Sequence, residues 1–284
     1  MLICLLALAA PRLLGEPQSA FTLLSDSGQT AVGKPEIDLQ PRWEVRTPMA
    51  TARSRLAAVV VGDNLFVIGG ERENGQALDT VSAYDLRINE WRAFAPLPMP
   101  LANLAATVLD EQIYVAGGSY AGPTDEGTIH ISDQFWRYDL EEGSWQELAT
   151  LPAPLAGASL VAHQGSLFLI GGWDGETMRN EIWRYTPVAQ GDGENGSWAL
   201  DSRLETARGF AGATSVNDEI YLFGGFDGED ELDLAEAYSP DKGSWRQLPP
   251  LPTPRSGQSV VYDGLAIFVL GGGLDRAVGK PGPI

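Results

Sequence analysis

Residues 145–172 read WQELATLPAPLAGASLVAHQGSLFLIGG and contain one complete copy of the pattern that decides the fold. A tryptophan opens this stretch, two short apolar runs follow, and a glycine pair closes it. The runs 158–162 and 166–170 flank a turn that carries Gln-Gly. Short apolar runs bounded by turn residues are typical of buried strands joined as a hairpin.

The same pattern recurs along the chain. The glycine pairs are Gly69-Gly70, Gly117-Gly118, Gly171-Gly172, Gly224-Gly225 and Gly271-Gly272. The tryptophans that precede them are Trp43, Trp91, Trp145, Trp198 and Trp245. The interval from each tryptophan to its first glycine is identical in every copy, whereas the interval between successive glycine pairs varies. This constant interval indicates one structural unit of fixed geometry.

Two further strands are predicted in each unit. After each of the first four glycine pairs a loop leads to a third run ending at Tyr84, Tyr138, Tyr185 or Tyr238, and a polar turn then leads to the next tryptophan. Each unit is therefore predicted to be a four-stranded antiparallel meander. Small first-strand residues suit a crowded central axis, and a glycine pair permits a close approach of backbones. Radial repetition of such sheets protects their edges, so an all-β propeller is expected.

The motifs of the unit resemble those of the kelch repeat. They are the glycine pair, Tyr-Asp at Tyr84-Asp85 and Tyr138-Asp139, the tryptophan that follows the tyrosine at the same distance in both, and the following Leu-Pro. The resemblance covers residues 43–272 and implies a kelch-type β-propeller, in most members of six or seven blades, with a binding role. The third unit departs from the pattern, because Thr-Pro follows Tyr185 and an insertion separates that tyrosine from Trp198.

The blade count depends on the chain ends. Five blades closed by the N- and C-terminal segments are favoured, and six remain open because residues 20–35 are similar to 266–281. We expect an apolar segment at 1–19, a linker or ring-closing strand at 20–42, and the propeller at 43–284. The apolar segment is interpreted as a degraded signal or anchor, or as a frayed terminus. The first interpretation favours a secreted or envelope location.

Composition excludes several classes of function. Lys and Arg number 19 against 38 Asp and Glu, so the formal net charge is −19, which argues against binding to nucleic acid or to anionic lipid surfaces. The chain has one cysteine and two histidines, so no metal or cofactor is expected. The apolar run at the N-terminus is far shorter than the roughly 20 residues of a transmembrane helix. A monomer is expected.

A candidate ligand site follows from aligning the units. The residues at one fixed offset before each first glycine are Arg53, Leu101, Leu155, Arg208 and Arg255. On a closed ring the three arginines would form an arc at the axial mouth, and guanidinium groups bind carboxylates and phosphates bidentately. The predicted ligand-binding residues are Arg53, Ser54, Asn103, Trp173, Arg208, Phe226, Arg255 and Ser256. A competing interpretation is that the arginines pair with neighbouring acidic loops.

The sequence predicts a non-enzymatic interaction module that binds a protein or glycan partner through these loops, with an acidic peptide or sugar suiting the arginines. The alternative is a metal-independent sugar isomerase resembling sialic-acid mutarotase, since that bacterial enzyme looks like this fold and needs no metal. His163 is expected to be a solvated turn residue, and His130 lacks enough companions for a metal site. The acidic run 229–233 is expected to be a solvated loop. No catalytic residue is predicted.

Overall fold

The computed structural model of the chain describes residues 44–121, 128–188 and 196–273. The chain divides into two units, Met1–Pro48 and Met49–Ile284. In the first unit, residues 44–48 form no helix or strand, and Arg46 makes an ion pair with Glu44 at 2.8 Å. The second unit contains all the strands described below.

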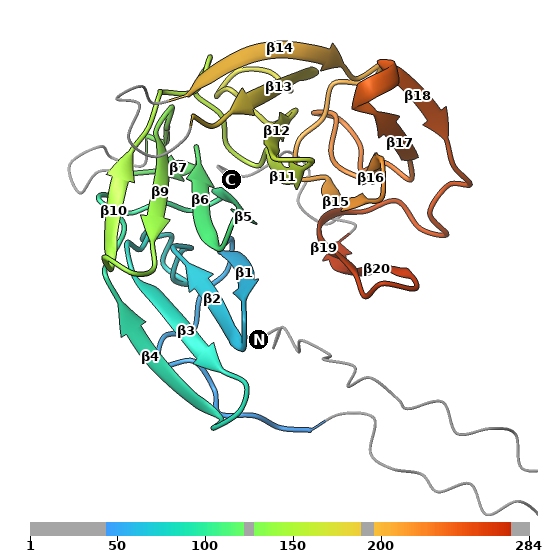
Figure 1. Ribbon diagram of the computed structural model, residues 1–284. Coiled ribbons are helices and arrows are strands. Elements are labelled where there is room, and N and C mark those ends of the chain that lie inside the picture. The colour runs from blue at the N-terminus through green and yellow to red at the C-terminus, as the bar shows by residue number, and fades with distance from the viewer. Residues whose placement is uncertain (1–43, 122–127, 189–195, 274–284) are drawn as a thin grey trace, which may run out of the picture. The chain divides into compact units, whose positions relative to one another are not determined.

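The second unit is an all-β propeller of four-stranded antiparallel blades (Figure 1). Blade 1 contains β1 (Ala57–Val61), β2 (Asn64–Ile68), β3 (Val81–Asp85) and β4 (Glu90–Phe94). Blade 2 contains β5 (Ala105–Leu109), β6 (Gln112–Ala116), β9 (Phe135–Asp139) and β10 (Ser144–Glu147), and its loop adds the short hairpin of β7 (Ser119–Tyr120) and β8 (His130–Ile131). Blade 3 contains β11 (Ser159–His163), β12 (Ser166–Ile170), β13 (Glu181–Thr186) and β14 (Ser197–Arg203). Blade 4 contains β15 (Gly212–Val216), β16 (Glu219–Phe223), β17 (Ala235–Ser239), the 3₁₀ turn η1 (Pro240–Lys242) and β18 (Ser244–Gln247). A last hairpin pairs β19 (Ser256–Tyr262) with β20 (Ile267–Gly273).

The tyrosine and tryptophan of each repeat form a cross-strand pair. They lie directly opposite each other on the third and fourth strands of every complete blade, with ring centroids 4.8 to 5.2 Å apart. The indole N–H of Trp145 donates to the carbonyl of Ala95 at 3.0 Å, and that of Trp198 donates to Ala149 at 3.2 Å. Each of these indoles therefore reaches the segment that leaves the preceding blade, which explains its place in the repeat.

The glycine pairs join successive blades. Gly70 donates its N–H to the carbonyl of Leu101 in the next blade at 2.8 Å. Equivalent bonds of 2.8 to 3.0 Å run from Gly118 to Leu155, from Gly172 to Arg208 and from Gly225 to Arg255. A Cβ on Gly69 would lie 2.5 Å from the carbonyl oxygen of Leu101, and Gly69 has a φ of +59°. The first glycine is thus required by both close approach and conformation.

A second set of main-chain bonds joins the segments that precede the first strands, here called the lead-in segments. One residue in each lead-in segment has φ between 53° and 67°, and these residues are Arg55, Asn103, Gly157, Phe210 and Gly257. From Asn103 onward, the N–H of each of these residues donates to the carbonyl of the equivalent residue in the preceding blade, at 2.7 to 2.9 Å. Left-handed backbone is unfavourable for a residue such as Phe210, so these bonds hold the lead-in segments in place.

The apolar core lies between neighbouring blades. One cluster packs Phe66 and Ile68 of blade 1 against Leu101 and Trp136 of blade 2. Similar clusters join blade 2 to blade 3 and blade 3 to blade 4. Because every blade must cover its neighbour, burial of apolar surface and the main-chain links act at the same junctions.

The prediction of five complete blades is wrong for the described residues, which form four complete blades and one hairpin. The hairpin β19–β20 has no third or fourth strand among the residues described. Phe268 is therefore 43% exposed, whereas its counterpart Phe66 in blade 1 is 2% exposed. Residues 1–43, which include Trp43, the predicted ring-closing strand at 20–42 and the similar segment 20–35, lie outside the described part of the chain. Within that part, no helix has the length and apolar character needed to span a membrane.

Candidate functional site

The predicted arginines Arg53 and Arg255 bind main-chain carbonyls of their own repeats. Arg53 Nη1 donates to the carbonyl of Gly69 at 3.0 Å and to Thr80 Oγ1 at 2.6 Å. Arg255 Nη1 donates to the carbonyl of Gly271 at 2.7 Å, the equivalent position. Burial lowers the pKa of Arg53. Both guanidinium groups thus cap the first glycine of a pair.

Arg208 has a different environment, because it is only 1% exposed. Its Nη2 forms an ion pair with Glu236 Oε2, and its Nη1 donates to the carbonyl of Thr206 at 3.5 Å. A second oxygen of the same carboxylate, Glu236 Oε1, accepts from Gln247 Nε2 at 3.4 Å. The guanidinium of Arg208 is therefore enclosed at the junction of blades 3 and 4, and binding of an acidic ligand to the three arginines stays a prediction.

The smaller predicted residues lie in the lead-in segments. The main chain of Ser54 pairs with Glu71, and Ser256 begins β19 opposite Gly273. Asn103 is buried, and its Nδ2 donates to Ser119 Oγ at 3.0 Å. These contacts fix the backbone near the glycine pairs.

Trp173 and Phe226 begin two loops of the same design. Asp174 Oδ1 accepts from the N–H groups of Glu176 and Thr177, each at 2.8 Å. Asp227 Oδ1 accepts in the same way from the two N–H groups at the equivalent positions of its loop. Burial raises the pKa of Asp174, but these N–H groups and Arg179 outweigh that effect and lower its pKa overall. Each loop is consequently held by its own aspartate.

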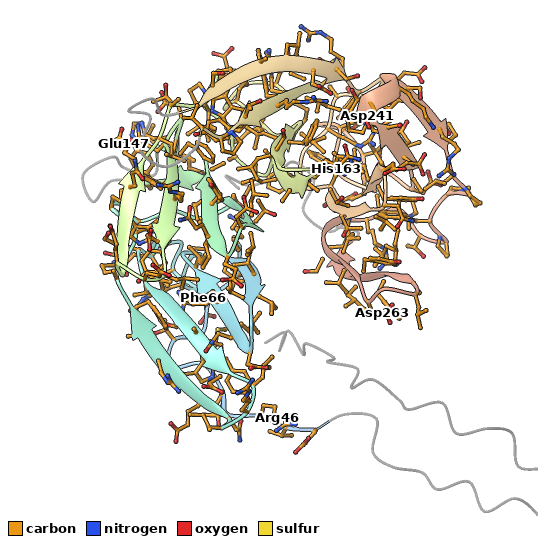
Figure 2. The ribbon with its side chains drawn as sticks, in the orientation of Figure 1. Arg46, Phe66, Glu147, His163, Asp241 and Asp263 are labelled. Atoms are coloured by element: carbon orange, nitrogen blue, oxygen red, sulfur yellow. The ribbon has the colours of Figure 1, made fainter. Side chains whose placement is uncertain are left out.

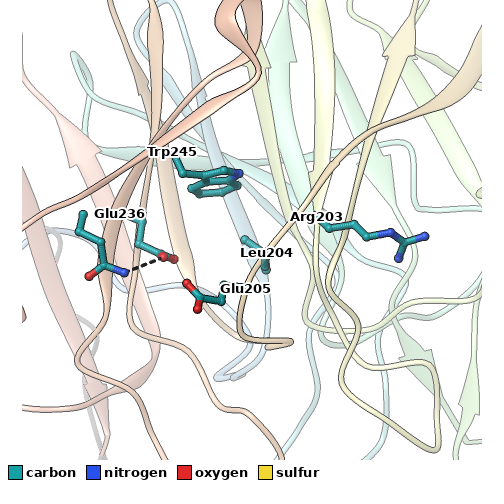
Figure 3. Close-up of a pocket in the computed structure, with 6 residues that line it drawn as sticks. Arg203, Leu204, Glu205, Glu236 and Trp245 are labelled. Atoms are coloured by element: carbon teal, nitrogen blue, oxygen red, sulfur yellow. Dashed lines mark hydrogen bonds between the residues drawn. The ribbon is translucent and has the colours of Figure 1, made fainter.

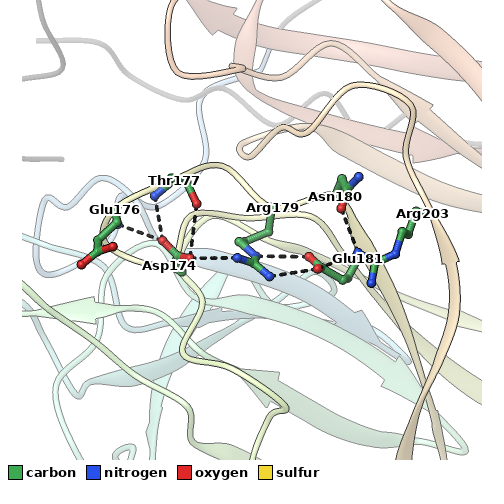
Figure 4. A network of polar contacts seen from close by, with 7 residues as sticks. All are labelled: Asp174, Glu176, Thr177, Arg179, Asn180, Glu181 and Arg203. Carbon is green, nitrogen blue, oxygen red and sulfur yellow. Dashed lines mark hydrogen bonds and ion pairs between the residues drawn. The ribbon is translucent and has the colours of Figure 1, made fainter.

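A polar network fixes the first of these loops to blade 3 (Figure 4). Arg179 pairs with Asp174 at 3.3 Å and with Glu181 at 2.9 Å. Glu181 also pairs with Arg203 at the end of β14 at 2.7 Å. Burial raises the pKa of Glu181, but hydrogen bonds from Arg203 and Arg179 lower it overall. The loop is therefore positioned before any ligand arrives.

Half-buried apolar side chains gather in and beside these loops, and we call this set the loop face. Its members are Tyr120, Ile131, Trp173, Met178, Phe210 and Phe226. A Cβ on Gly175 would lie 3.3 Å from Ile131, and one on Gly209 would lie 3.3 Å from the sulfur of Met178. The loops of blades 2, 3 and 4 are thus in contact with one another or with the next lead-in segment.

Trp173 and Phe226 were predicted from the sequence, whereas the other members of the loop face were not. The signal for Phe210 was its place two residues after Arg208, where it takes the position that a glycine has in two other repeats. Acidic side chains border the loop face, among them the exposed Glu176, Glu229 and Asp230. Among the described residues, no group of three or more His, Cys, Asp or Glu side chains is arranged to hold a metal ion.

The prediction for His163 is wrong. His163 is 4% exposed, and its Nδ1 lies 2.8 Å from Ser215 Oγ of blade 4. Burial lowers the pKa of His163. The positive charge of Arg184 lowers it further, whereas the negative charges of Asp241 and Asp218 act in the opposite direction. His163 is the last residue of β11, and its ring reaches Ser215 of the neighbouring blade. The ring therefore lies at the junction of blades 3 and 4 (Figure 2). His130 instead stacks on Tyr120, with ring centroids 5.3 Å apart.

The repeated four-stranded blades and their glycine links define a β-propeller, and comparison with known proteins identifies its family. Residues 39–198 match the KLHDC2/KLHL20/DRC7 Kelch-repeats domain, and residues 207–252 match the Kelch motif. The chain therefore belongs to the kelch-repeat β-propeller family, as its motifs indicated.

Several curated proteins are similar to the chain over most of its length. Kelch-like protein 15 of Danio rerio is 28% identical over 251 residues, covering 81% of this chain and 40% of that protein. Beta-scruin of Limulus polyphemus is 26% identical over 248 residues, covering 81% of this chain and 26% of that protein. The chain thus spans less than half the length of either relative. A solved structure titled "Structure of YjhT" has a TM-score of 0.70 at 18% identity, covering 84% of this chain and 82% of that one, which supports the fold alone.

Proposed function

We propose that the chain is a non-enzymatic interaction module that binds a protein partner through its loop face. The observation that carries the proposal is the set of half-buried aromatic and methionine side chains on loops fixed by Asp174, Asp227 and the Arg179 network. Loops placed on a rigid scaffold commonly carry binding residues. Aromatic and methionine side chains are also enriched in protein interfaces.

The charge around the loop face favours a basic partner segment. In the loops 173–179 and 226–233 the acidic residues are Asp174, Glu176, Asp227, Glu229, Asp230, Glu231 and Asp233. The same loops contain one basic residue, Arg179, which is engaged by Asp174 and Glu181. Complementary charge would steer a basic segment toward the apolar anchors and would raise its association rate. Membership of the kelch family, with relatives such as beta-scruin and Kelch-like protein 15, is consistent with an interaction role.

A displayed library of random peptides tests this proposal without knowledge of the natural partner. We expect selected peptides to combine an apolar residue with Lys or Arg and to lose binding to W173A/F226A. The control variant I88A changes an exposed apolar residue in the turn between β3 and β4, and it should bind as the parent does.

Thermal unfolding must show that each variant remains folded. Selection of acidic peptides whose binding is lost in R53A/R255A would contradict the loop-face proposal and favour the arginine site. Retained binding to W173A/F226A would contradict it as well.

A further inference from the structure

A cavity of about 370 Å³ opens at the junction of blades 3 and 4 (Figure 3). Its walls are Arg203, Leu204 and Glu205, where β14 ends, and Glu236, Trp245 and Gln247 of strands β17 and β18. Leu204 and Glu236 are buried, whereas Glu205 is exposed. The cavity is therefore open to solvent on the side of Glu205 and closed by apolar and charged groups inside.

The repeat explains why the cavity occurs at this junction. Glu236 lies two residues before Tyr238, and the equivalent third-strand positions of blades 2 and 3 are Trp136 and Trp183. Trp136 belongs to the apolar cluster between blades 1 and 2, and Trp183 packs against the apolar cluster between blades 2 and 3. Glutamate is much smaller than tryptophan. The space that an indole occupies in blades 2 and 3 therefore holds only a carboxylate in blade 4. Arg208 stands where those blades have leucine, and it neutralises this carboxylate from within.

The walls present an aromatic ring and a carboxylate toward the same space. Figure 3 shows the indole of Trp245 beside the carboxylates of Glu205 and Glu236. The guanidinium of Arg203 points away from them, and it is paired with Glu181 at 2.7 Å. Glu236 is engaged by Arg208 and Gln247, so Glu205 supplies the charge that faces an incoming ligand. An aromatic ring next to a carboxylate attracts a cation through the ring quadrupole and through charge.

We infer that this cavity binds the cationic side chain of an arginine or a lysine. The cation lies against the face of Trp245 that Tyr238 does not cover and pairs with Glu205, while its aliphatic part contacts Leu204. Arginine should bind more tightly than lysine because the planar guanidinium both stacks and donates in pairs. The inference does not depend on the loop face, since the cavity would accept such a side chain as a small molecule.

Saturation-transfer NMR with three small probes tests the inference. The probes are N-acetyl-arginine amide, N-acetyl-lysine amide and N-acetyl-citrulline amide, the last being a neutral analogue of the first. We expect the arginine or the lysine probe to bind the parent chain at millimolar concentration, and the citrulline probe not to bind. Glu205→Gln should weaken binding about threefold to fivefold, the effect of losing one exposed ion pair.

Two further variants separate the cavity from general charge effects. The double variant R208L/E236W installs the Leu and Trp found in blades 2 and 3, fills the space, and should abolish binding while the chain stays folded. Glu142→Gln removes an exposed carboxylate on the turn between β9 and β10, and it should leave binding unchanged. Equal binding of the citrulline probe, no binding of either cationic probe, or unchanged binding in R208L/E236W would overturn the inference.

Discussion

The junction between blades 3 and 4 differs from the two junctions before it, although all three have the same main-chain links. Leu101 with Trp136, and Leu155 with Trp183, supply apolar side chains to the first two junctions, whereas Arg208 and Glu236 form a buried ion pair at the third. The glycine and lead-in hydrogen bonds keep lengths of 2.7 to 3.0 Å at every junction. The backbone therefore sets the repeat, and the side chains at a junction are free to change. A cavity opens at this changed junction.

The largest effect on stability is expected when only one partner of the Arg208–Glu236 ion pair is removed. Arg208→Leu leaves the carboxylate of Glu236 buried without its cation, so we expect a loss of about 3–5 kcal/mol in the free energy of unfolding. Urea unfolding followed by tryptophan fluorescence measures this loss. Leu101→Met, the matched change at an apolar junction, should cost less than about 1.5 kcal/mol. Similar costs for the two variants would show that the junctions do not differ in this way.

Changing a glycine that links two blades should cost almost as much stability at an apolar junction, such as the one between blades 1 and 2. Gly69→Ala places a Cβ against the carbonyl of Leu101 and forces alanine into left-handed backbone. We expect a loss of about 2–4 kcal/mol in the free energy of unfolding, again from urea titration. Gly62→Ala is a control with positive φ and no atom within 4 Å of the new Cβ, so it should lose only about 1–2 kcal/mol. Equal losses would remove close approach as the reason for the glycine pair.

The pH dependence of stability should reveal the buried histidine of the changed junction. Burial lowers the pKa of His163 in the folded state below its ordinary value of 6.5, so the unfolded chain binds the proton more readily. The neutral ring of His163 makes its full contribution to the free energy of unfolding above pH 6.5, and this contribution is lost as the pH falls below that value. Between pH 7 and pH 5 the parent should therefore lose more of its free energy of unfolding than His163→Gln does. Parallel pH profiles of melting temperature for the two proteins would contradict this assignment.

The smallest effect on stability is expected at the mouth of the cavity. Glu205 is exposed, so Glu205→Gln should change the free energy of unfolding by less than about 0.5 kcal/mol. Thermal unfolding checks this value. A larger loss would mean that Glu205 supports the junction itself, and that its effect on ligand binding is indirect.

Most of the fold could be predicted from the sequence because the repeat interval is fixed by geometry. The constant interval from tryptophan to glycine pair spans the fourth strand of one blade and the first two strands of the next, so it locates three strands in each unit. The four-stranded antiparallel unit and the close approach of backbones at the glycine pairs followed from the same alignment and are confirmed. The number of complete blades did not follow, because it depends on strands outside the repeated motif.

The candidate site was harder to predict because a sequence does not show what a polar side chain contacts. Alignment placed Arg208 correctly at the lead-in position, but its partner Glu236 lies 28 residues away, in strand β17. His163 was assigned to a turn, although Ser215 of the next blade lies against it. Comparison of third-strand positions between repeats sets Leu101 with Trp136, Leu155 with Trp183 and Arg208 with Glu236, and Arg53 with Ser82 in blade 1, so a polar residue accompanies each of these two arginines.

A double-mutant cycle on Arg208 and Glu236 tests most directly whether junction side chains can be exchanged on a constant backbone. The four proteins are the parent, Arg208→Leu, Glu236→Trp and R208L/E236W, each measured by urea unfolding. We predict that each single change is strongly destabilising and that the double variant returns to within about 1 kcal/mol of the parent, since apolar replacement of a buried ion pair is often neutral or stabilising. Additive losses in the double variant would contradict the account.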